Sequence, residues 1–140
     1  MPVLGGAATS APVNTGAETL SIGAELNRIR HAEGLAPLTR DPALDAAAAR
    51  HAADLSARGV LSHRGADGTG PRERMARQGY AACLSAENVA RGQRDAAAVM
   101  AAWMDSAPHR RNILLAQATD FGAARGPGNT WVLKIARPCR

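Results

Sequence analysis

The chain has 140 residues, of which 46% are hydrophobic and 21% charged, so it holds one globular domain and has no room for a second. The longest apolar runs fall short of the roughly 18 residues of a membrane-spanning helix, and an aromatic content of only 3% disfavours base-stacking surfaces and aromatic carbohydrate-binding strips. The net charge is +5, and the excess lies in residues 71–140, where eleven basic residues face five acidic ones.

Residues 1–17 are small, uncharged and rich in Ala, Gly and Pro, and this composition predicts a disordered leader. The leader lacks the basic and long apolar segments of a signal peptide, so no export signal is visible in this chain. A trimmed exported protein has the same appearance. We therefore place the folded domain at residues 18–140.

Two amphipathic helices are predicted in the first half of this domain. Residues 15–18 (Thr-Gly-Ala-Glu) fit a capping box, so the first helix begins near Thr15 and ends near Gly34. The second helix begins with an Asp-Pro pair and ends at a glycine, two signals typical of helix ends. Its bounds are Asp41 and Gly59, and its predicted buried stripe is Leu44, Ala48, His51 and Leu55.

The rest of the chain combines a Gly-rich loop, short helices and strands. In chain order these are a loop (60–70), a helix (71–78), an extended segment (80–89), a helix capped by Asp95, a break (106–108), a helical turn (109–115) and two strands (121–125 and 130–136). In the last strand, Trp131, Leu133 and Ile135 alternate with Val132, Lys134 and Ala136. This order favours an α+β fold with a central antiparallel sheet covered by helices, because the regular alternation of a parallel sheet is missing.

The four histidines differ in their surroundings. His31 lies at the polar end of the first helix and is predicted to be a surface residue near the helix C-terminus. His51 lies in an apolar stripe, which favours a core histidine satisfied by a hydrogen bond, although it can also approach a polar cleft. His63 lies in a Gly-rich loop, where core packing does not explain the presence of an imidazole. It is therefore a candidate functional residue. No H-E-x-x-H protease motif is present.

Glu87 and His109 complete the candidate set. Glu87 has apolar neighbours, so it is predicted to be partly buried and to need a cation or hydrogen-bond donors. His109 follows the break at residues 106–108, where a capping role is the simpler interpretation. His63, Glu87 and His109 together have the ligand types of a zinc ion that keeps an open position for water. The sequence alone does not bring them together, and no G-x-S-x-G or nucleotide-binding glycine motif is present.

The two cysteines, Cys83 and Cys139, belong to no C-x-x-C pair, which excludes a thiolate zinc site or a thioredoxin-like motif. They either form one disulfide or remain as two partly buried thiols. The position of Cys139 beside the C-terminus favours pairing, because an exposed free thiol is a liability in an oxidising compartment.

Several segments, taken in order, resemble the bacterial branch of the CAP superfamily, which comprises cysteine-rich secretory, antigen-five and pathogenesis-related proteins and is also called the SCP domain. The resemblance covers about residues 18–139. The matching segments are Leu26-Asn27-Arg28-Ile29-Arg30, Gly34-Leu35-Ala36-Pro37-Leu38, Leu44 to Ala48, His51-Ala52-Ala53-Asp54-Leu55, Ser62-His63-Arg64-Gly65-Ala66-Asp67-Gly68, Gly79-Tyr80, Glu87-Asn88-Val89-Ala90, Trp103-Met104-Asp105-Ser106 and His109-Arg110-Arg111-Asn112-Ile113-Leu114.

This resemblance implies an α-β-α sandwich, export from the cytoplasm, and a cleft of His and Glu residues that binds a divalent metal in some members. His63 matches the first histidine of that cleft and Glu87 its first glutamate. The eukaryotic branch has a second glutamate and a second histidine where this chain has Asp105-Ser106 and residues 119–121 (Thr-Asp-Phe). The bacterial pattern offers His109 instead, so the predicted metal ligands are His63, Glu87 and His109, with zinc as the candidate ion.

Three functions are compatible with these observations. The favoured one is a secreted or periplasmic binding module, a monomer, whose His/Glu cleft holds a divalent metal and whose basic half meets a lipid or an anionic cell-surface polymer. The second is a metal-dependent hydrolase in which Glu87 is the general base on bound water. The third is a structural extracellular domain with a vestigial cleft. The lack of a nucleophile motif disfavours an enzyme, and the lack of a Lys/Arg-rich run disfavours nucleic acid as a partner.

Overall fold

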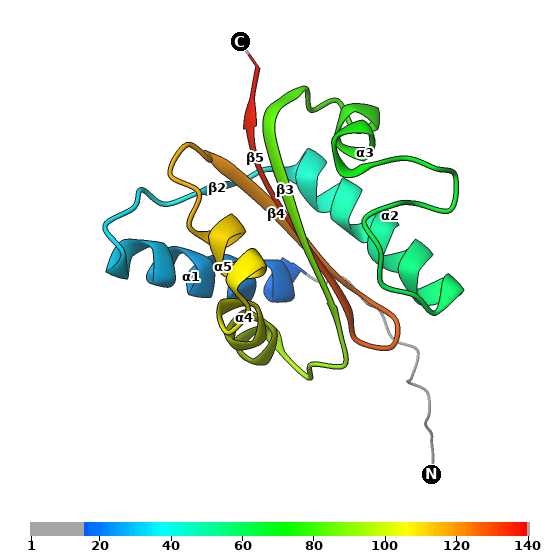
Figure 1. Ribbon diagram of the computed structural model, residues 1–140, viewed down its shortest axis with the longest axis horizontal. Coiled ribbons are helices and arrows are strands. Elements are labelled where there is room, and N and C mark those ends of the chain that lie inside the picture. The colour runs from blue at the N-terminus through cyan, green and yellow to red at the C-terminus, as the bar shows by residue number, and fades with distance from the viewer. Residues whose placement is uncertain (1–15, 140) are drawn as a thin grey trace.

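The computed structural model describes residues 16–139, with side chains from residue 21 onward. A central sheet lies between two layers of helices, which confirms the predicted α+β fold and the α-β-α sandwich (Figure 1). One layer contains α1 (Gly16–Ala32), α4 (Ala96–Met104) and α5 (Ala107–Ile113), and the other contains α2 (Pro42–Arg58) and α3 (Pro71–Arg77). Residues 1–15 of the predicted leader, including the Thr15 cap, lie outside the described residues.

The sheet has four strands in the order β2-β4-β5-β3. The long strands β3 (Ala82–Arg91), β4 (Asp120–Gly126) and β5 (Thr130–Pro138) pair antiparallel, as predicted. The short strand β2 (Thr39–Arg40) pairs parallel with β4, so the sheet as a whole is mixed. The strand β2 was not predicted, because two residues carry no measurable periodicity.

The predicted helix ends of α2 are confirmed by local geometry. The side chain of Asp41 accepts a hydrogen bond from the backbone N–H of Ala43, and Pro42 occupies the first turn, where it needs no donor. Gly59 ends the helix with a φ of 68°, in the left-handed region that glycine enters without a steric cost. These caps fix where α2 presents its buried residues to the sheet.

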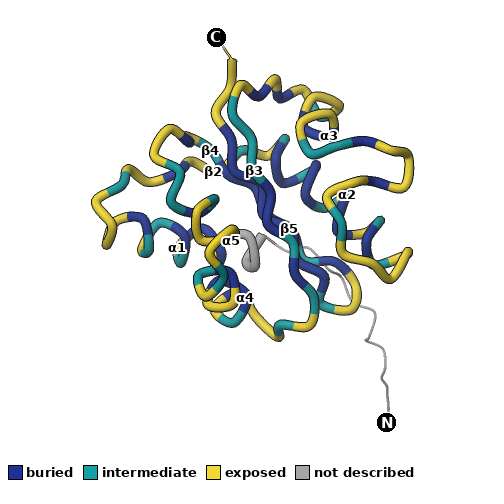
Figure 2. Tube along the Cα trace, viewed as in Figure 1, coloured by how far each residue is buried: buried dark blue, intermediate teal, exposed yellow. Residues whose placement is uncertain are grey.

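Strand alternation divides the core into two parts, and Figure 2 shows the buried strands in the centre with exposed segments around them. On β5, Trp131, Leu133 and Ile135 join the large apolar cluster under α1, α4 and α5. The intervening side chains face α2 and α3, where the apolar clusters are smaller. The alternation predicted for this strand is therefore confirmed, and it places Lys134 on the α2–α3 side of the sheet.

Cys83 and Cys139 form a disulfide with a Cα–Cα distance of 4.8 Å. It links the beginning of β3 to the residue that follows β5, so it fastens the end of the described chain to the strand that carries Glu87. In the part of the chain that the structure describes, every helix is too short or too polar to cross a bilayer.

Candidate functional site

The sheet presents Glu87 and Lys134 side by side. Glu87 on β3 pairs in register with Lys134 on β5, and Lys134 pairs with Gly122 on β4. Because neighbouring strands in register direct paired residues to the same face, the carboxylate and the ammonium group both point toward α2 and α3. The side chain of Lys134 is 0% exposed and that of Glu87 is 1% exposed, so both charges are removed from water.

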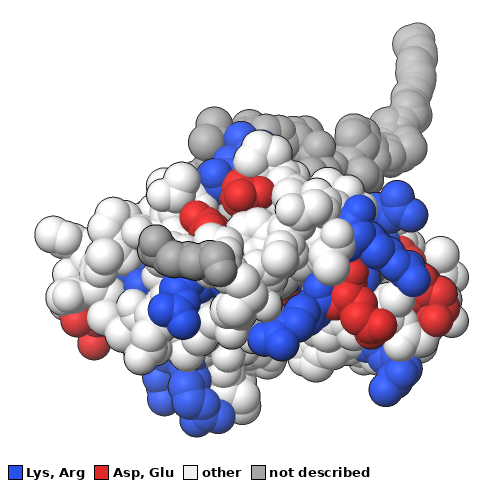
Figure 3. Space-filling model, turned by 90° about the horizontal axis from the view of Figure 1, so that it is seen from above, with Lys and Arg blue, Asp and Glu red and all other residues white. Residues whose placement is uncertain are grey.

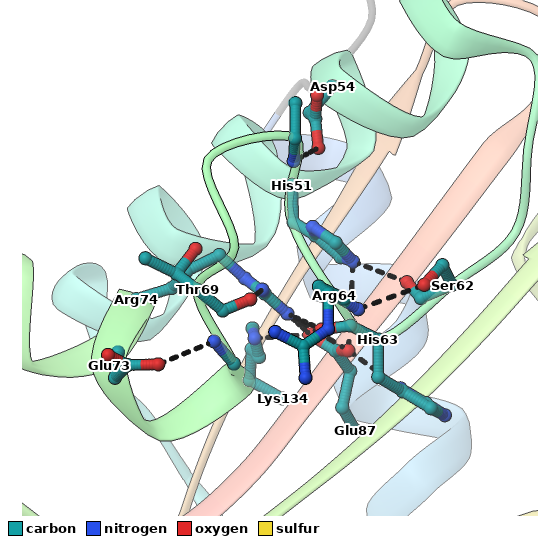
Figure 4. Close-up of polar contacts among 12 residues, drawn as sticks. His51, Asp54, Ser62, His63, Arg64, Thr69, Glu73, Arg74, Glu87 and Lys134 are labelled. Atoms are coloured by element: carbon teal, nitrogen blue, oxygen red, sulfur yellow. Dashed lines mark hydrogen bonds and ion pairs between the residues drawn. The ribbon is translucent and has the colours of Figure 1, made fainter.

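Four nitrogen-bearing side chains surround the Glu87 carboxylate, as Figure 4 shows. His63 Nδ1 lies 2.8 Å from Oε1, and Arg74 Nη2 donates to Oε2 at 3.0 Å. Lys134 Nζ donates to the same oxygen Oε2. His51 Nε2 lies 3.7 Å from Oε1, outside ordinary hydrogen-bond distance. Glu87 therefore has the cation and the donors that sequence analysis expected, and it is more fully buried than expected.

This environment keeps Glu87 ionised. Burial raises the pKa of its carboxyl group, but the hydrogen bond from His63 and the charge and hydrogen bond of Lys134 outweigh burial and lower the pKa to about 2. Burial also lowers the pKa of Lys134, while the charge of Glu87 opposes that change. The two groups thus form a buried ion pair, in which each charge depends on the other.

Arg74 connects this ion pair to the loop that carries His63. Its Nη1 donates to the backbone carbonyl of Thr69 at 2.7 Å, and its Nη2 donates to the carbonyl of His63 at 2.8 Å as well as to Glu87. The loop is also fastened from α2, because Asp54 accepts from the backbone N–H of Ala66 at 3.1 Å. The loop position of His63 is therefore set by an arginine and an aspartate on two different helices.

His31 and His51 take the places predicted for them. His31 is exposed in the last turn of α1. His51 is buried, and its Nε2 lies 2.7 Å from the carbonyl oxygen of Ser62. Since a carbonyl only accepts, Nε2 carries the hydrogen in this contact. His51 also approaches the polar cluster around Glu87, so both parts of its prediction are confirmed.

His63 is the accessible member of the cluster, with 57% of its side chain exposed. It lines a cleft of about 330 Å³ between α3 and β3, which we call the His63 cleft. The other lining residues are Gly70, Pro71, Arg72, Glu73, Ser85, Ala86 and Glu87. Glu73 accepts a hydrogen bond from the backbone N–H of Gly70 at 2.8 Å, whereas Arg72 is an exposed cation at the rim.

His109 lies on α5, in the opposite helical layer. Its Nδ1 is 2.9 Å from Ser106 Oγ, and its backbone carbonyl accepts from Asn88 Nδ2 at 3.1 Å. Burial lowers the pKa of His109, and the nearby charge of His63 lowers it further. His109 therefore stands near the edge strand β3, but within residues 16–139 it shares no direct hydrogen bond or ion pair with His63 or Glu87.

The cluster as arranged does not fit a metal ion. Among residues 16–139, no group of three or more His, Cys, Asp or Glu side chains is placed to hold one. Both oxygens of Glu87 already accept hydrogen bonds from Arg74, and Lys134 adds a further one to Oε2. A divalent cation at Glu87 would repel both of these cations. The ligand set His63, Glu87 and His109 remains a prediction from the residue types and from the resemblance.

Arg74 and Lys134 were not predicted to be parts of this cluster. Lys134 is the only lysine of the chain and interrupts an otherwise apolar strand, on the face opposite Trp131 and Leu133. A cation at such a position needs a buried anion, so this signal was available. Arg74 carries no comparable signal, because a charged residue in a short helix is usually exposed.

A family model described as the cysteine-rich secretory protein family (CAP) matches residues 24–133. YkwD of Bacillus subtilis (strain 168) is 32% identical over 114 residues, which cover 81% of this chain and 44% of that protein. An extracellular protein containing an SCP domain from Bacillus anthracis str. Ames aligns with a TM-score of 0.83 and 24% identity over 91% of this chain and 45% of that one. An outer surface protein from Borrelia burgdorferi aligns with a TM-score of 0.79 and 21% identity over 93% of this chain and 100% of that one. The chain thus spans less than half the length of both Bacillus proteins.

Proposed function

The chain belongs to the cysteine-rich secretory protein (CAP) family, and from this premise we propose that it is an extracellular binding domain whose His63 cleft receives an anionic group. Two observations support the extracellular location. The names of the aligned structures include "extracellular" and "outer surface". The chain also contains a disulfide, and structural disulfides persist mainly in oxidising compartments.

The observation that carries the proposal is the charge balance around Glu87. Two buried cations, Arg74 and Lys134, contact one buried carboxylate, so the cluster has an excess positive charge even when both histidines are neutral. Buried charges are screened less than exposed ones, so this excess reaches the adjoining cleft. Arg72 at the rim adds a second positive charge, and Glu73 opposes it. The net field in the cleft favours an anion.

The same contacts argue against the hydrolase hypothesis. A general base works best when its pKa lies near the working pH, whereas the pKa of Glu87 is lowered to about 2. Its lone pairs are also directed at His63, Arg74 and Lys134. Glu87 is therefore a weak base with little freedom to meet a water molecule, and its role in this proposal is to position His63.

The basic side chains on the surface do not form one continuous patch that could attract an anionic partner. Figure 3 shows the basic side chains of one face as separate groups, and on its right side acidic side chains lie among them. We therefore assign the preference for anions to the His63 cleft and not to the basic half of the chain as a whole. The ligand class is a phosphate- or carboxylate-bearing cell-surface polymer, and a lipid headgroup is the alternative source of the same chemistry.

The test compares soluble polyphosphate with vesicles of phosphatidylglycerol or phosphatidylcholine, at low and high salt, by fluorescence anisotropy and sedimentation. We expect polyphosphate to bind at low salt and high salt to weaken it. Arg72→Ala and His63→Ala should each weaken it about tenfold, which corresponds to about 1.4 kcal/mol. Binding to phosphatidylglycerol vesicles alone would assign the cleft to lipid headgroups.

Arg94→Ala is the matched control, because the side chain of Arg94 is 89% exposed and lies outside the cleft. Equal losses in Arg94→Ala and Arg72→Ala would overturn the assignment to the cleft, and so would no binding by the unchanged protein. Zinc added to the same samples tests the metal prediction. We expect it to leave binding unchanged, whereas a zinc effect that disappears in both His63→Ala and His109→Ala would establish those two ligands.

A further inference from the structure

The strand β3 stands at one end of the sheet, so it pairs with β5 along one edge only. We call the other edge the outer edge of β3. On β5, the carbonyl of Ala136 accepts a hydrogen bond at 3.0 Å from the N–H of Thr119, which lies beside β4. The backbone groups of successive residues point to opposite edges of a strand. The odd-numbered residues of β5 therefore point toward β3.

The strand register then shows which residues of β3 point outward. Ala86 pairs with the odd-numbered Ile135, so the backbone groups of Ala86 face β5. Its neighbours Ser85 and Glu87 therefore direct their N–H and C=O groups out of the sheet. A side-chain contact agrees with this direction, because Asn112 Nδ2 approaches the outward carbonyl of Glu87 at 3.5 Å.

The outer edge is covered at its two ends and open between them. At one end, Trp103 Nε1 donates to the carbonyl of Val89 at 3.2 Å. At the other end, Arg72 Nη2 donates to the carbonyl of Cys83 at 3.4 Å. In the middle, the N–H and C=O groups of Ser85 have no hydrogen-bond partner among the described residues. Ser85 is half-buried and lines the His63 cleft, so the cleft opens beside these groups.

The open stretch lacks the features that usually protect an edge strand. Such strands commonly carry lysine or proline, or are covered by another segment, so that no further chain can pair with them. Residues 84–86 (Leu-Ser-Ala) have neither a charge nor a proline. The helices α3 and α5 lie on either side of β3 and leave the strand between them (Figure 1). This short stretch is therefore suited to pair with a few residues of an extended chain.

The two faces of the sheet define the side chains of such a partner. A residue paired with Ser85 has its side chain on the face of Ser85 and Glu87, where Arg72 and the His63 cleft lie. An acidic side chain fits this position. The residues before and after it face the other way, over Leu84 and Ala86, which are half-buried beside the large apolar cluster. Apolar side chains fit those two positions.

We propose that the outer edge of β3 binds an extended peptide as a fifth strand, with an acidic residue opposite Ser85 and an apolar residue on each side of it. The N–H of the acidic residue donates to the Ser85 carbonyl, and its carbonyl accepts from the Ser85 N–H. The preference for an acidic residue rests on the function proposed for the His63 cleft, whereas the strand pairing does not. A second copy of this chain is a poorer partner, because it would bring its own positively charged cleft to the same place.

Hydrogen exchange of the free full-length chain, followed by nuclear magnetic resonance, tests whether the edge is open. We expect the amide of Ser85 to exchange at least about tenfold faster than that of Ala86, which is bonded to β5. Equal protection of the two amides would overturn the proposal, because the edge would already be occupied. A dimer in sedimentation that Ser85→Pro dissociates would also overturn it, since the partner would then be a second copy.

The binding test uses a short peptide, acetylated and amidated at its ends, with the central sequence Val-Glu-Val. A methyl group on the backbone nitrogen of the glutamate removes the donor to Ser85 and should weaken binding at least about tenfold. The matched control carries the methyl group on the nitrogen of the following valine, which points away from β3, and should lose less than about threefold. Equal losses, or no binding by the unmethylated peptide, would overturn the proposal.

A peptide with glutamine in place of the glutamate separates this proposal from the function of the cleft. We expect it to bind about tenfold more weakly than the acidic peptide. An unchanged affinity, together with the expected effect of the methyl groups, would overturn the acidic preference and the function proposed for the cleft. It would leave the strand pairing confirmed.

A variant of the protein tests the same hydrogen bond from the other side. Ser85→Pro removes the outward N–H without breaking a bond to β5, and we expect it to weaken peptide binding at least about tenfold. Arg40→Pro is the matched control on the opposite edge strand β2, where the N–H groups of Thr39 and Asp41 bond toward β4 and that of Arg40 points out of the sheet. Equal losses in the two variants would overturn the proposal. The methylated peptides decide the question even where a proline prevents folding.

Discussion

The two faces of the sheet are covered by different kinds of side chain. The face under α1, α4 and α5 is covered by large apolar side chains, including Trp103, Phe121 and Trp131. The face under α2 and α3 has two smaller apolar clusters, in which five of the ten buried members are alanines, and it holds the buried charges of Glu87, Lys134 and Arg74. The first face contributes most of the apolar burial, and the second contributes the candidate site.

A buried arginine on the apolar face makes the contrast sharper. Arg30 donates from Nη1 to the backbone carbonyls of Ile113 and Leu115, and from Nε to that of Ala36. It has no acidic partner among the described residues, and burial lowers its pKa. On this face a buried cation fastens loops through neutral acceptors. On the other face the cations are held by a carboxylate, which makes that cluster sensitive to pH and to charge substitution.

The largest predicted effect comes from the close packing of α2 on β4. A Cβ added at Gly122 would lie 2.3 Å from the backbone carbon of Leu44 and 2.4 Å from the backbone nitrogen of Asp45. Backbone cannot move aside as a flexible side chain can, so Gly122→Ala must displace α2. We expect it to lower the free energy of unfolding by at least about 4 kcal/mol, measured by urea denaturation.

Gly70→Ala is the control for this prediction. Gly70 has a φ of −93°, and its added Cβ would lie 3.7 Å from the nearest atom, Glu73 Oε1. We expect a change within about 1 kcal/mol. If Gly122→Ala and Gly70→Ala lowered the free energy of unfolding by similar amounts, tight packing against α2 would not be a distinguishing feature of this face of the sheet.

The next effect in size comes from the buried charges. Glu87→Gln leaves Lys134 and Arg74 buried without a carboxylate, and we expect a loss of about 3 kcal/mol in the free energy of unfolding. The double variant Glu87→Gln with Lys134→Met removes one unpaired cation and should recover part of that loss. A double variant that is less stable than Glu87→Gln alone would contradict the ion-pair interpretation.

Much of the fold could be predicted from the sequence because its signals are local. The Asp-Pro start and the glycine end of α2, and the alternation of residues 130–136, each depend on neighbouring residues, and each is confirmed. The strand β2 depends instead on a parallel pairing of Thr39 with Asp120, far along the chain. No local pattern specifies such a pairing, so it was missed.

The candidate site was predictable only in part, for the same reason. Glu87 was identified because a carboxylate among apolar residues needs a partner, and His63 because a loop gives an imidazole no structural purpose. Their direct contact, and the roles of Arg74 and Lys134, follow from the register of β3 and β5 and from the position of α3. These features belong to the tertiary structure, and the spacing of residues along the chain does not reveal them.

The last predicted effect distinguishes the two faces by pH, and it is small except at acid pH. The pKa of Glu87 is lowered from its ordinary 4.5 to about 2, so its contribution is complete above pH 4.5 and is lost as the pH falls toward 2. That loss is on the order of 3 kcal/mol at the acid extreme and is smaller at every intermediate pH. Burial also lowers the pKa of His51, so the unfolded chain takes up a proton below about pH 6.5 that the native chain does not. Both groups make the protein less stable as the pH falls.

Thermal unfolding measured from pH 7 to pH 2 checks this prediction in two variants. One is expected to lose the same stability at every pH, and the other to differ from the unchanged protein in a pH-dependent way. Leu26→Ala, on the apolar face, removes a buried side chain without a titrating group, so it should lower the stability by about 2–5 kcal/mol at every pH. Glu87→Gln removes the titrating carboxylate, so its stability curve should run parallel to that of the unchanged protein near pH 7 and converge with it below pH 4.5. Parallel curves for Glu87→Gln down to pH 2 would mean that the carboxylate is not held ionised by its buried cations, and the chemical distinction between the two faces would then reduce to packing alone.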